Sequence, residues 1–397
     1  MTPLCLRAAA LDTKFGQDYD VHVWIGTIKV FVPKYAMRAA VLEKFNEPLV
    51  VREFDKPALG PGEVLVRMLA AGVCGSDIHM WHGKDPRIPL PTIIGHEGVG
   101  EVEEIGPEPP KSISGRELRR GDRIAWDRGV TCGQCFFCAV RHEPNLCPNR
   151  WAYGIGRSSE KPPYLVGCYA EYIVLVRGTN IIHLDEFPST DYVLLASTSC
   201  SGATAANAVE VAGIELGSAV LVQGSGPLGL FLTAFASMLG ASPIVVVGGS
   251  PDSLSLALKL GADLVLSHRT TSSKERMEAI REIAPRGIDV VLESSGRPDS
   301  INEGIRALRT GGSYISTGFA VPGASVTIDC YQDLVRKNLR LQGVWTSHTR
   351  HLYQALALAS QNPMLGEMIT STFTLEQATD ALVAMEQREA IKSAIVF

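Results

Sequence analysis

The sequence predicts an α/β protein of two domains, a β-rich lobe followed by a doubly wound parallel sheet. Three observations support this prediction. The chain has 397 residues, which is too long for one ordinary hydrophobic core. Short apolar or alternating runs bounded by Gly, Pro and Asp occupy residues 37–182 and are typical of strands. From residue 201 onward apolar strands alternate with helical segments, which is typical of a parallel sheet covered by helices.

Composition excludes several classes of function. The net charge of −5 offers no basic surface for a nucleic acid. No window approaches the ~18 uncharged apolar residues that a membrane span requires. Four of the nine cysteines are clustered, which favours metal binding in the reducing cytoplasm over disulfides. We therefore expect a cytoplasmic protein that acts on small molecules, with no nucleic acid and no membrane as partners.

Residues 1–36 are interpreted as an N-terminal extension. They lack the sustained apolar core of a secretory signal, and Asp12, Asp18 and Asp20 count against a transit peptide. Two origins are open, a flexible extension or an upstream start codon. The first domain is expected to begin at Met37 and to continue to residue 200.

The predicted strands of the first domain include residues 64–74, 98–106, 122–126 and 169–176. Residues 107–120 are rich in proline and then in charge, so we expect an exposed hairpin tip or insertion there. The second domain is expected over residues 201–345. Residues 346–397 are expected to return to the first domain and to end in a strand.

Six apolar runs define the second domain. The predicted strands are residues 219–224, 243–248, 263–267, 288–294, 313–317 and 339–345. Between them we expect helices over residues 227–240, 272–284, 299–309 and 331–338. A further helix is expected to begin at Pro251, with Ser250 as its N-cap.

A glycine-rich turn predicts a nucleotide site at the start of the second domain. Gly224, Gly226 and Gly229 have G-x-G-x-x-G spacing, with Pro227 and Leu228 between the last two. The turn follows a buried strand and opens a helix, so its backbone can approach a pyrophosphate at the helix N-terminus. The second strand ends in Gly248, Gly249 and Ser250, where NAD-binding proteins carry an acidic residue. Neither that acid nor an arginine is present in this loop, so NAD and NADP both stay open.

Two groups of residues have the chemistry of zinc ligands. Cys132, Cys135, Cys138 and Cys147 lie within 16 residues, and four thiolates can close a tetrahedral shell around a structural zinc. Cys74 and His96 offer a thiolate and an imidazole, but a third ligand must come from elsewhere. Ser76, Asp77 and His79 follow Cys74 closely.

Taken together, these motifs resemble the zinc-dependent medium-chain alcohol dehydrogenases. The resemblance covers residues 37–397 and rests on GVCGSDIH, GHEGVG, the four-cysteine loop, SCSGAT and GSGPLG in that order. It implies a GroES-like catalytic domain followed by a Rossmann domain. CFFCAVRHEPNLCPNRWAYG and CSGATA are most similar to a branch with bacterial hydroxycamphor dehydrogenases.

The resemblance implies a role for each candidate site residue. By position, Cys200 matches the third catalytic zinc ligand beside Cys74 and His96. Glu97 matches a carboxylate that can approach the metal and help exchange its ligands, and Asp77 matches the carboxylate that orients the ligand histidine. Polyol and threonine dehydrogenases carry glutamate where this chain has Cys200, so the cysteine favours simple or cyclic alcohols.

Ser76 and His79 match the proton relay of the family, which runs from the substrate hydroxyl through Ser76 and the cofactor ribose to His79 and solvent. His82 is a less favoured substitute for His79, and His142 is expected to face solvent. Two departures stand out. The last gap in the cysteine loop is eight residues where relatives have seven, which predicts a bulge at Pro144, and Gly75 replaces a basic residue that contacts the pyrophosphate in many relatives.

The sequence therefore predicts an enzyme with two zinc ions per chain, one catalytic and one structural, and NAD or NADP. The reaction is expected to be the reversible oxidation of a secondary alcohol, cyclic alcohols included, to a ketone. The alternatives are a polyol or aldehyde dehydrogenase of the same family and a non-catalytic nicotinamide-binding relative. Trp81, Trp151 and Trp345 are expected to line the substrate pocket, and the family pairing implies a homodimer or homotetramer.

Overall fold

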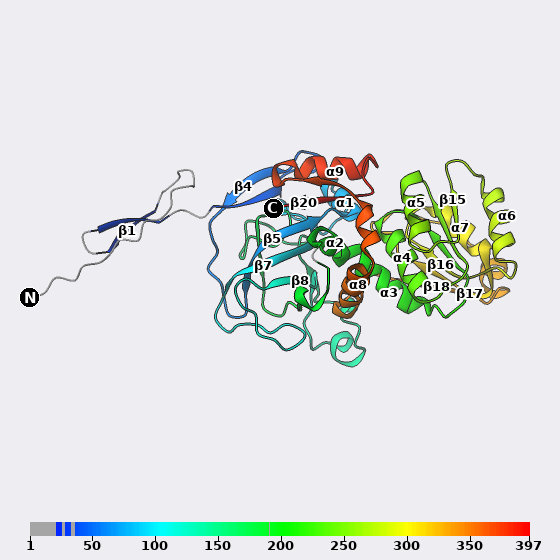
Figure 1. Ribbon diagram of the computed structural model, residues 1–397, viewed down its shortest axis with the longest axis horizontal. Coiled ribbons are helices and arrows are strands. Elements are labelled where there is room, and N and C mark those ends of the chain that lie inside the picture. Colours follow the sequence, from blue (N-terminus) through cyan, green and yellow to red (C-terminus); the bar gives the residue numbers. More distant parts are fainter. Residues whose placement is uncertain (1–20, 26–27, 33–35, 190) are drawn as a thin grey trace, which may run out of the picture.

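The computed structural model describes residues 21–25, 28–32, 36–189 and 191–397 of the chain. Strands β1 (Val21–Ile25) and β2 (Ile28–Val32) pair antiparallel with each other. The remainder of the predicted extension, up to residue 35, lies outside the described residues. The predicted α/β class with a β-rich lobe and a six-stranded parallel sheet is confirmed, and Figure 1 shows the two parts side by side.

The β-rich lobe is built around a seven-stranded sheet in the order β12-β8-β7-β5-β20-β19, with β11 also paired to β5. A three-stranded sheet, β4-β3-β6, and the pair β10-β9 complete the lobe. The strands are β3 (Met37–Leu42), β4 (Val50–Phe54), β5 (Val64–Gly72), β6 (Thr92–Ile93), β7 (Glu97–Ile105), β8 (Arg123–Trp126), β9 (Gly129–Val130), β10 (Trp151–Ala152), β11 (Tyr172–Leu175), β12 (Ile181–His183), β19 (Ile369–Phe373) and β20 (Lys392–Val396).

The end of the chain joins this sheet beside the metal segment. Strand β20 pairs antiparallel with β5, with Ala394 opposite Gly72. Strand β7 pairs with β5 on its other side and sets Glu97 opposite the same glycine. Because β5 lies between them, the first residue of β20 and the first residue of β7 are both brought close to the segment that follows β5. This pairing places a C-terminal residue in the site described below.

The second part is a six-stranded parallel sheet in the order β15-β14-β13-β16-β17-β18. Helices cover both faces of this sheet. The side chains of each strand point alternately to one helical layer and to the other, because successive side chains in a strand point to opposite faces. Val220 and Val222 of β13 pack with α3, α4 and α5, whereas Leu221 packs with α6 and α7. The strands are β13 (Val220–Gln223), β14 (Ile244–Gly248), β15 (Leu264–Ser267), β16 (Ile288–Glu293), β17 (Leu308–Ser316) and β18 (Arg340–Gly343).

Nine α-helices occur in the described residues: α1 (Gly75–Trp81), α2 (Tyr192–Ser197), α3 (Ala203–Ala212), α4 (Pro227–Met238), α5 (Pro251–Lys259), α6 (Ser273–Ile283), α7 (Pro298–Ala307), α8 (Thr349–Gln361) and α9 (Ala378–Glu386). Where a helix was predicted over residues 331–338, the structure has a π-helical segment, η5 (Cys330–Val335). Within the described residues, no helix is long and apolar enough to cross a membrane.

The two parts share one hydrophobic core at their junction. Helix α8 packs on α3 and on the π-helical segment η4 (Thr198–Gly202), and Figure 1 shows it between the two sheets. Buried Ala70 and Val99 of the first sheet belong to the same cluster of residues as Val220 of the second. The two parts are therefore joined by packed side chains and not by a linker alone. Cys200 is the central residue of η4, which belongs to this junction.

Candidate active site

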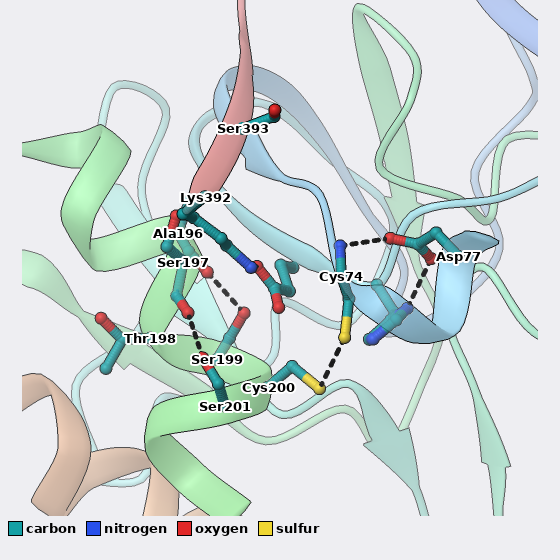
Figure 2. A network of polar contacts seen from close by, with 12 residues as sticks. Cys74, Asp77, Ala196, Ser197, Thr198, Ser199, Cys200, Ser201, Lys392 and Ser393 are labelled. Carbon is teal, nitrogen blue, oxygen red and sulfur yellow. Dashed lines mark hydrogen bonds and ion pairs between the residues drawn. The ribbon is translucent and has the colours of Figure 1, made fainter. Parts of the chain in front are cut away.

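Asp77 orders the first half of the site. Cys74 is the N-cap of α1, and its backbone N–H donates to the Asp77 carboxylate at 2.8 Å. The other carboxylate oxygen lies 3.0 Å from Nδ1 of His96. The hydroxyl of Tyr169 donates to Asp77 at 2.9 Å, and Asp77 is fully buried. One carboxylate thus fixes the backbone of Cys74 and the ring of His96, and Nε2 of His96 is the ring nitrogen available to a metal. Figure 2 shows the bond between Cys74 and Asp77.

Cys200 supplies the third donor from the other side of the site. Its Sγ lies 3.7 Å from Sγ of Cys74, and the two thiols face each other in Figure 2. One ligand atom from each of Cys74, His96, Glu97 and Cys200 lies within 4.8 Å of the others. The contact between the sulfurs lowers the pKa of Cys74 and raises that of Cys200. Two sulfurs and an imidazole at this spacing are the donor set that suits zinc, so the residues fit the predicted metal.

Glu97 forms a buried ion pair that the sequence did not reveal. Its Oε2 lies 2.6 Å from Nζ of Lys392, and both side chains are within 1% of complete burial. Burial raises the pKa of Glu97, while the ammonium of Lys392 acts in the opposite direction. Lys392 opens β20, so it reaches Glu97 through the pairing of β20 with β5 and not through proximity in the sequence.

The residues of the predicted relay lie along one cavity. Oγ of Ser76 is 3.2 Å from Sγ of Cys74 and 3.4 Å from Nε2 of His96. His79 is half-buried on the same cavity, and burial lowers its pKa below the ordinary histidine value. His82 instead bonds Asn46 and Glu386, and it does not line the cavity. The geometry therefore favours His79 over His82.

The cavity has a volume of about 320 Å³ and lies between the two domains. Leu228, Thr317 and Val344 of the second domain line it together with Cys74, His96 and Cys200. Of the three predicted tryptophans only Trp345 lines this cavity. The expectation for Trp81 was wrong, because Trp81 is the last residue of α1, packs in the core and donates its Nε1–H to the carbonyl of Glu47.

The expectation for Trp151 was also wrong. Its ring packs under the guanidinium of Arg157, whose carbon lies 4.0 Å from the ring centroid, and it lines a separate hollow. Two residues that the sequence did not single out lie in the cavity instead, Arg128 and Arg150. Arg128 precedes β9 and Arg150 precedes β10, and these two short strands pair with each other.

The predicted phosphate cradle follows β13. Gly224 has a φ of +114°, which L-residues with side chains rarely adopt, and a Cβ on Gly229 would lie 1.9 Å from the carbonyl oxygen of Gly224. Gly226 is the N-cap of α4, and Pro227 is its first residue. Gly224, Gly226, Gly248 and Ser250 line a cavity of about 340 Å³. Ser250 takes the predicted N-cap position of α5, but its side chain makes no capping bond.

Basic side chains reach this second cavity from strands and loops beyond the predicted motif. Gly248 pairs with Ser267, so the residues after β15 lie beside the loop after β14. A Cβ on Gly249 would meet the ring of His268 at 2.6 Å and Nε of Arg269 at 3.2 Å. Arg297 lines the same cavity. Burial, followed by the charges of Arg297 and Arg269, lowers the pKa of His268.

The four-cysteine loop forms a second donor set. The Sγ atom of Cys135 lies 3.5 Å from that of Cys138 and 3.8 Å from that of Cys147, and Cys147 lies 3.5 Å from Cys132. These atoms fit one tetrahedral zinc. The segment between Cys138 and Cys147 contains a 3₁₀ turn, η2 (Pro144–Leu146), at the predicted bulge. His142 is exposed.

Comparison with known proteins agrees with this geometry. Residues 60–186 match the alcohol dehydrogenase GroES-like domain, and residues 227–361 match the zinc-binding dehydrogenase family. The chain is 31% identical over 365 residues to 5-exo-hydroxycamphor dehydrogenase of Pseudomonas putida, which covers 90% of this chain and 98% of that protein.

Two solved structures extend the comparison. An alcohol dehydrogenase from Thermotoga maritima is 44% identical, with a TM-score of 0.87 over 91% of this chain and 99% of that one. A protein from Sinorhizobium meliloti, described as a zinc-binding dehydrogenase and bound to NADP, is 27% identical, with a TM-score of 0.77 over 91% of this chain and 99% of that one. The chain belongs to the zinc-dependent medium-chain alcohol dehydrogenase family, as its motifs indicated, and it is an NAD(P)-dependent oxidoreductase of that family.

Proposed function

We propose that this enzyme interconverts a secondary alcohol and its ketone, with hydride transfer between substrate and NADP. One observation supports the proposal. Cys74, His96 and Cys200 lie together on a cavity that is also lined by Gly226, the N-cap of α4, and by Pro227 and Leu228, its first two residues. A metal centre and a nucleotide cradle on one cavity bring an alcohol and a hydride acceptor together.

The chain's own residues account for the steps around the hydride transfer. Zinc held by Cys74, His96 and Cys200 would act as a Lewis acid that makes the substrate hydroxyl more acidic. Ser76, whose Oγ lies beside two of these ligands, would take up the substrate proton and release its own hydroxyl proton toward His79 by way of the cofactor ribose. His79 then passes the proton to solvent, because its lowered pKa keeps its ring neutral and able to accept at neutral pH.

The choice of NADP rests on the charge around the adenosine end of the nucleotide cavity. The loop after β14 carries no carboxylate to bind a free 2′-hydroxyl. Arg269 and Arg297 line the cavity, and in the described part of the chain neither has a carboxylate oxygen within 4.0 Å. A 2′-phosphate would meet two guanidiniums and the hydroxyl of Ser250 there.

Cofactor binding tests this choice directly. The dissociation constants of NADPH and NADH are measured by fluorescence of the bound nicotinamide, for the wild type and Arg269→Gln. We expect the wild type to bind NADPH more tightly than NADH. In the variant the ratio of the two dissociation constants should fall about tenfold, since a hydrogen bond to a charged group contributes about 1.5–3 kcal/mol. Equal affinities for the two cofactors in the wild type would refute the preference.

The reaction itself is tested by formation of reduced cofactor with linear, cyclic and polyol alcohols, with and without a zinc chelator. We expect chelator-sensitive turnover of secondary alcohols. Turnover that survives complete removal of zinc would contradict the proposed role of Cys74, His96 and Cys200, and turnover of polyols alone would support the alternative substrate class.

We further propose that the enzyme works in the cytoplasm as a homodimer or homotetramer. All four residues of β18, the edge strand of the parallel sheet, are exposed, so a second copy could extend the sheet there. Analytical ultracentrifugation gives the oligomeric state, and a monomer at micromolar concentration would contradict this proposal.

A further inference from the structure

Arg128 is a buried cation beside the proposed catalytic centre. Its side chain is only 7% exposed, and it lines the cavity that holds Cys74, His96 and Cys200. Its Nη2 donates to the hydroxyls of Thr346 at 2.9 Å and of Thr204 at 3.4 Å. In the described chain no carboxylate oxygen lies within 4.0 Å of this guanidinium. Burial disfavours the charge of Arg128, but the nearby Cys200 and Cys74 sulfurs and Asp127 outweigh it and raise the pKa of Arg128, so the guanidinium stays charged on the wall of the cavity.

Arg150 lies beside Arg128 and shares its hydrogen-bond acceptor. Nη2 of Arg150 donates to the same Thr346 hydroxyl at 3.2 Å. Its guanidinium packs flat against Gly129, because a Cβ there would lie 2.3 Å from Nε of Arg150. Burial, with the charge of Arg128 second, lowers the pKa of Arg150 to about 10, so both guanidiniums are still charged at neutral pH.

The formal charges around the cavity balance when zinc is bound. Two thiolates, those of Cys74 and Cys200, then compensate the two charges of the metal. Lys392 compensates Glu97, and Arg87 is paired with Asp85 at 2.6 Å. Two further buried acids lie nearby. Asp77 faces His96, and Asp127 accepts from the backbone of Gly129 and the hydroxyl of Thr349. Arg128 and Arg150 formally balance these two acids, so an anionic group would be bound through direct hydrogen bonds from the guanidiniums and not through an excess of positive charge.

Thr346 holds the two guanidiniums together at the cost of backbone strain. Its φ is +56°, which is unusual for a β-branched residue, and its carbonyl oxygen accepts from Nδ2 of Asn207 at 2.8 Å. Such a conformation costs about 1–3 kcal/mol and is retained mainly at functional sites. The strain fixes a hydroxyl between two cations at the wall of the cavity.

We infer that Arg128 and Arg150 bind an anionic group of the alcohol substrate, a carboxylate or a phosphate. Guanidiniums bind both groups through two parallel hydrogen bonds. The inference rests on the proposed function and narrows its substrate to a secondary alcohol that carries an acid.

Matched substrate pairs test the inference. One arm compares 3-hydroxybutyrate, 4-hydroxypentanoate and 4-hydroxycyclohexanecarboxylate with their methyl esters. The other arm compares 2-hydroxypropyl phosphate with 1-methoxypropan-2-ol, so that the two arms separate carboxylate from phosphate. We expect kcat/KM for the anion of at least one pair to exceed that for its neutral partner about tenfold or more. Equal or higher values for every neutral partner would overturn the inference.

Arginine variants identify the residues responsible. Arg150→Gln is expected to lower kcat/KM for the preferred anion by about 10- to 100-fold and to leave its neutral partner nearly unchanged. Arg128→Lys tests the more buried arginine. It keeps the positive charge but removes the second of the two parallel hydrogen bonds that a guanidinium can donate to the anion. Arg157→Gln, a change at an arginine outside the cavity, is the control and should alter neither substrate. Equal loss on both members of a pair would also overturn the inference.

A binding measurement separates this inference from the proposed function. The full-length zinc-loaded enzyme is titrated calorimetrically with cyclohexanecarboxylate, which has no hydroxyl to oxidise, and with inorganic phosphate. Binding of one of them that weakens at least about tenfold in Arg150→Gln supports the anion site even if no alcohol is turned over. Absence of binding, or binding that the variant leaves unchanged, refutes it even if neutral alcohols are good substrates.

Discussion

A few buried polar residues set the chemistry of this site. Asp77 bonds the backbone of Cys74 and faces Nδ1 of His96, so two ligands from different segments are oriented by one carboxylate. Glu97 follows His96 directly and is held by Lys392. Each of these contacts is made in a water-excluded environment, where an unpaired partner would be costly. Two predictions follow from this arrangement at the scale of single residues.

Loss of the buried cation should destabilise the protein far more than loss of a surface one. Lys392→Met leaves Glu97 buried and unpaired, and we expect it to lower the free energy of unfolding by about 3–5 kcal/mol. Lys259 forms an ion pair of the same 2.6 Å length with Glu367 at the surface, so Lys259→Met is a matched control with an expected loss below about 1 kcal/mol.

Urea denaturation of zinc-loaded protein measures the free energy of unfolding of Lys392→Met and of Lys259→Met. The double variant Glu97→Gln with Lys392→Met should recover most of the loss, because it leaves no unpaired charge. A loss in Lys392→Met no larger than that in Lys259→Met would show that the buried pair contributes little.

The rate of alcohol oxidation should depend on the protonation of His79. Burial lowers the pKa of His79 below the ordinary value of about 6.5, so the ring is neutral above that lowered pKa and protonated below it. Alcohol oxidation requires the neutral ring as proton acceptor. Its rate should therefore fall as the pH drops through a value below about 6.5, and His79→Gln should lower the rate about 100-fold and abolish this inflection.

Two further measurements check the assignment to His79. Added imidazole should restore part of the activity of His79→Gln, because it can carry the proton in place of the missing ring. His82→Gln changes a histidine that bonds Asn46 and Glu386 outside the cavity, and it should behave like the wild type. An unchanged pH profile in His79→Gln would exclude His79 from the relay.

At the scale of elements, the four-cysteine loop and the strand pairs frame the cavity. The loop has little regular structure, only a short π-helical segment and a 3₁₀ turn, and its sulfurs face each other. Arg150 follows Cys147 by three residues and enters the cavity next to β10. A metal in this loop would therefore stabilise a wall of the substrate cavity as well as the loop itself.

Disruption of the loop should remove one metal and leave the other. Cys138→Ser is expected to contain one zinc per chain where the wild type contains two, because a structural site needs all four ligands. We expect a fall in melting temperature of more than about 5 °C, which corresponds to about 2 kcal/mol. Atomic absorption and differential scanning calorimetry measure the two effects. Two zinc ions per chain in this variant would show that the four sulfurs do not form the second site.

At the scale of the whole molecule, two separate binding units meet at one junction. The cradle belongs to the parallel sheet, whereas Cys74 and His96 belong to the β-rich lobe, and α8 packs across the junction beside η4. The cradle is formed by backbone geometry at Gly224 and Gly229 and includes no ligand of either proposed zinc. Metal binding and nucleotide binding should therefore be separable.

Removal of zinc should abolish turnover while cofactor binding persists. After dialysis against a strong chelator, we expect activity with any alcohol to fall below about 1% of the zinc-loaded value, since Lewis-acid stabilisation is worth several kcal/mol. The dissociation constant of NADPH, measured by fluorescence, should change less than about tenfold, because the cradle contains none of the zinc ligands. Loss of NADPH binding together with zinc would show that the parallel sheet depends on the metal sites of the other domain.

Much of this organisation was determined by the sequence itself. The cradle, the four cysteines, Cys74 with Ser76 and Asp77, and the pair His96–Glu97 are each encoded in short segments. Their chemistry depends on local spacing and on turn geometry, such as the positive φ that only glycine adopts easily at Gly224. The alternation of apolar strands and helices likewise predicted the parallel sheet, because each strand and helix carries its own periodicity.

Tertiary structure alone decided which distant residues complete the site. Lys392 lies 295 positions from Glu97 and reaches it because β20 pairs with β5. Arg128 and Thr346 are 218 positions apart, and Arg269 reaches the nucleotide cavity because β14 and β15 end at the same edge of the sheet. Trp81 and Trp151 were expected in the pocket and lie elsewhere. Strand pairing brings together residues from distant parts of the chain, and no local pattern in a single sequence records those contacts.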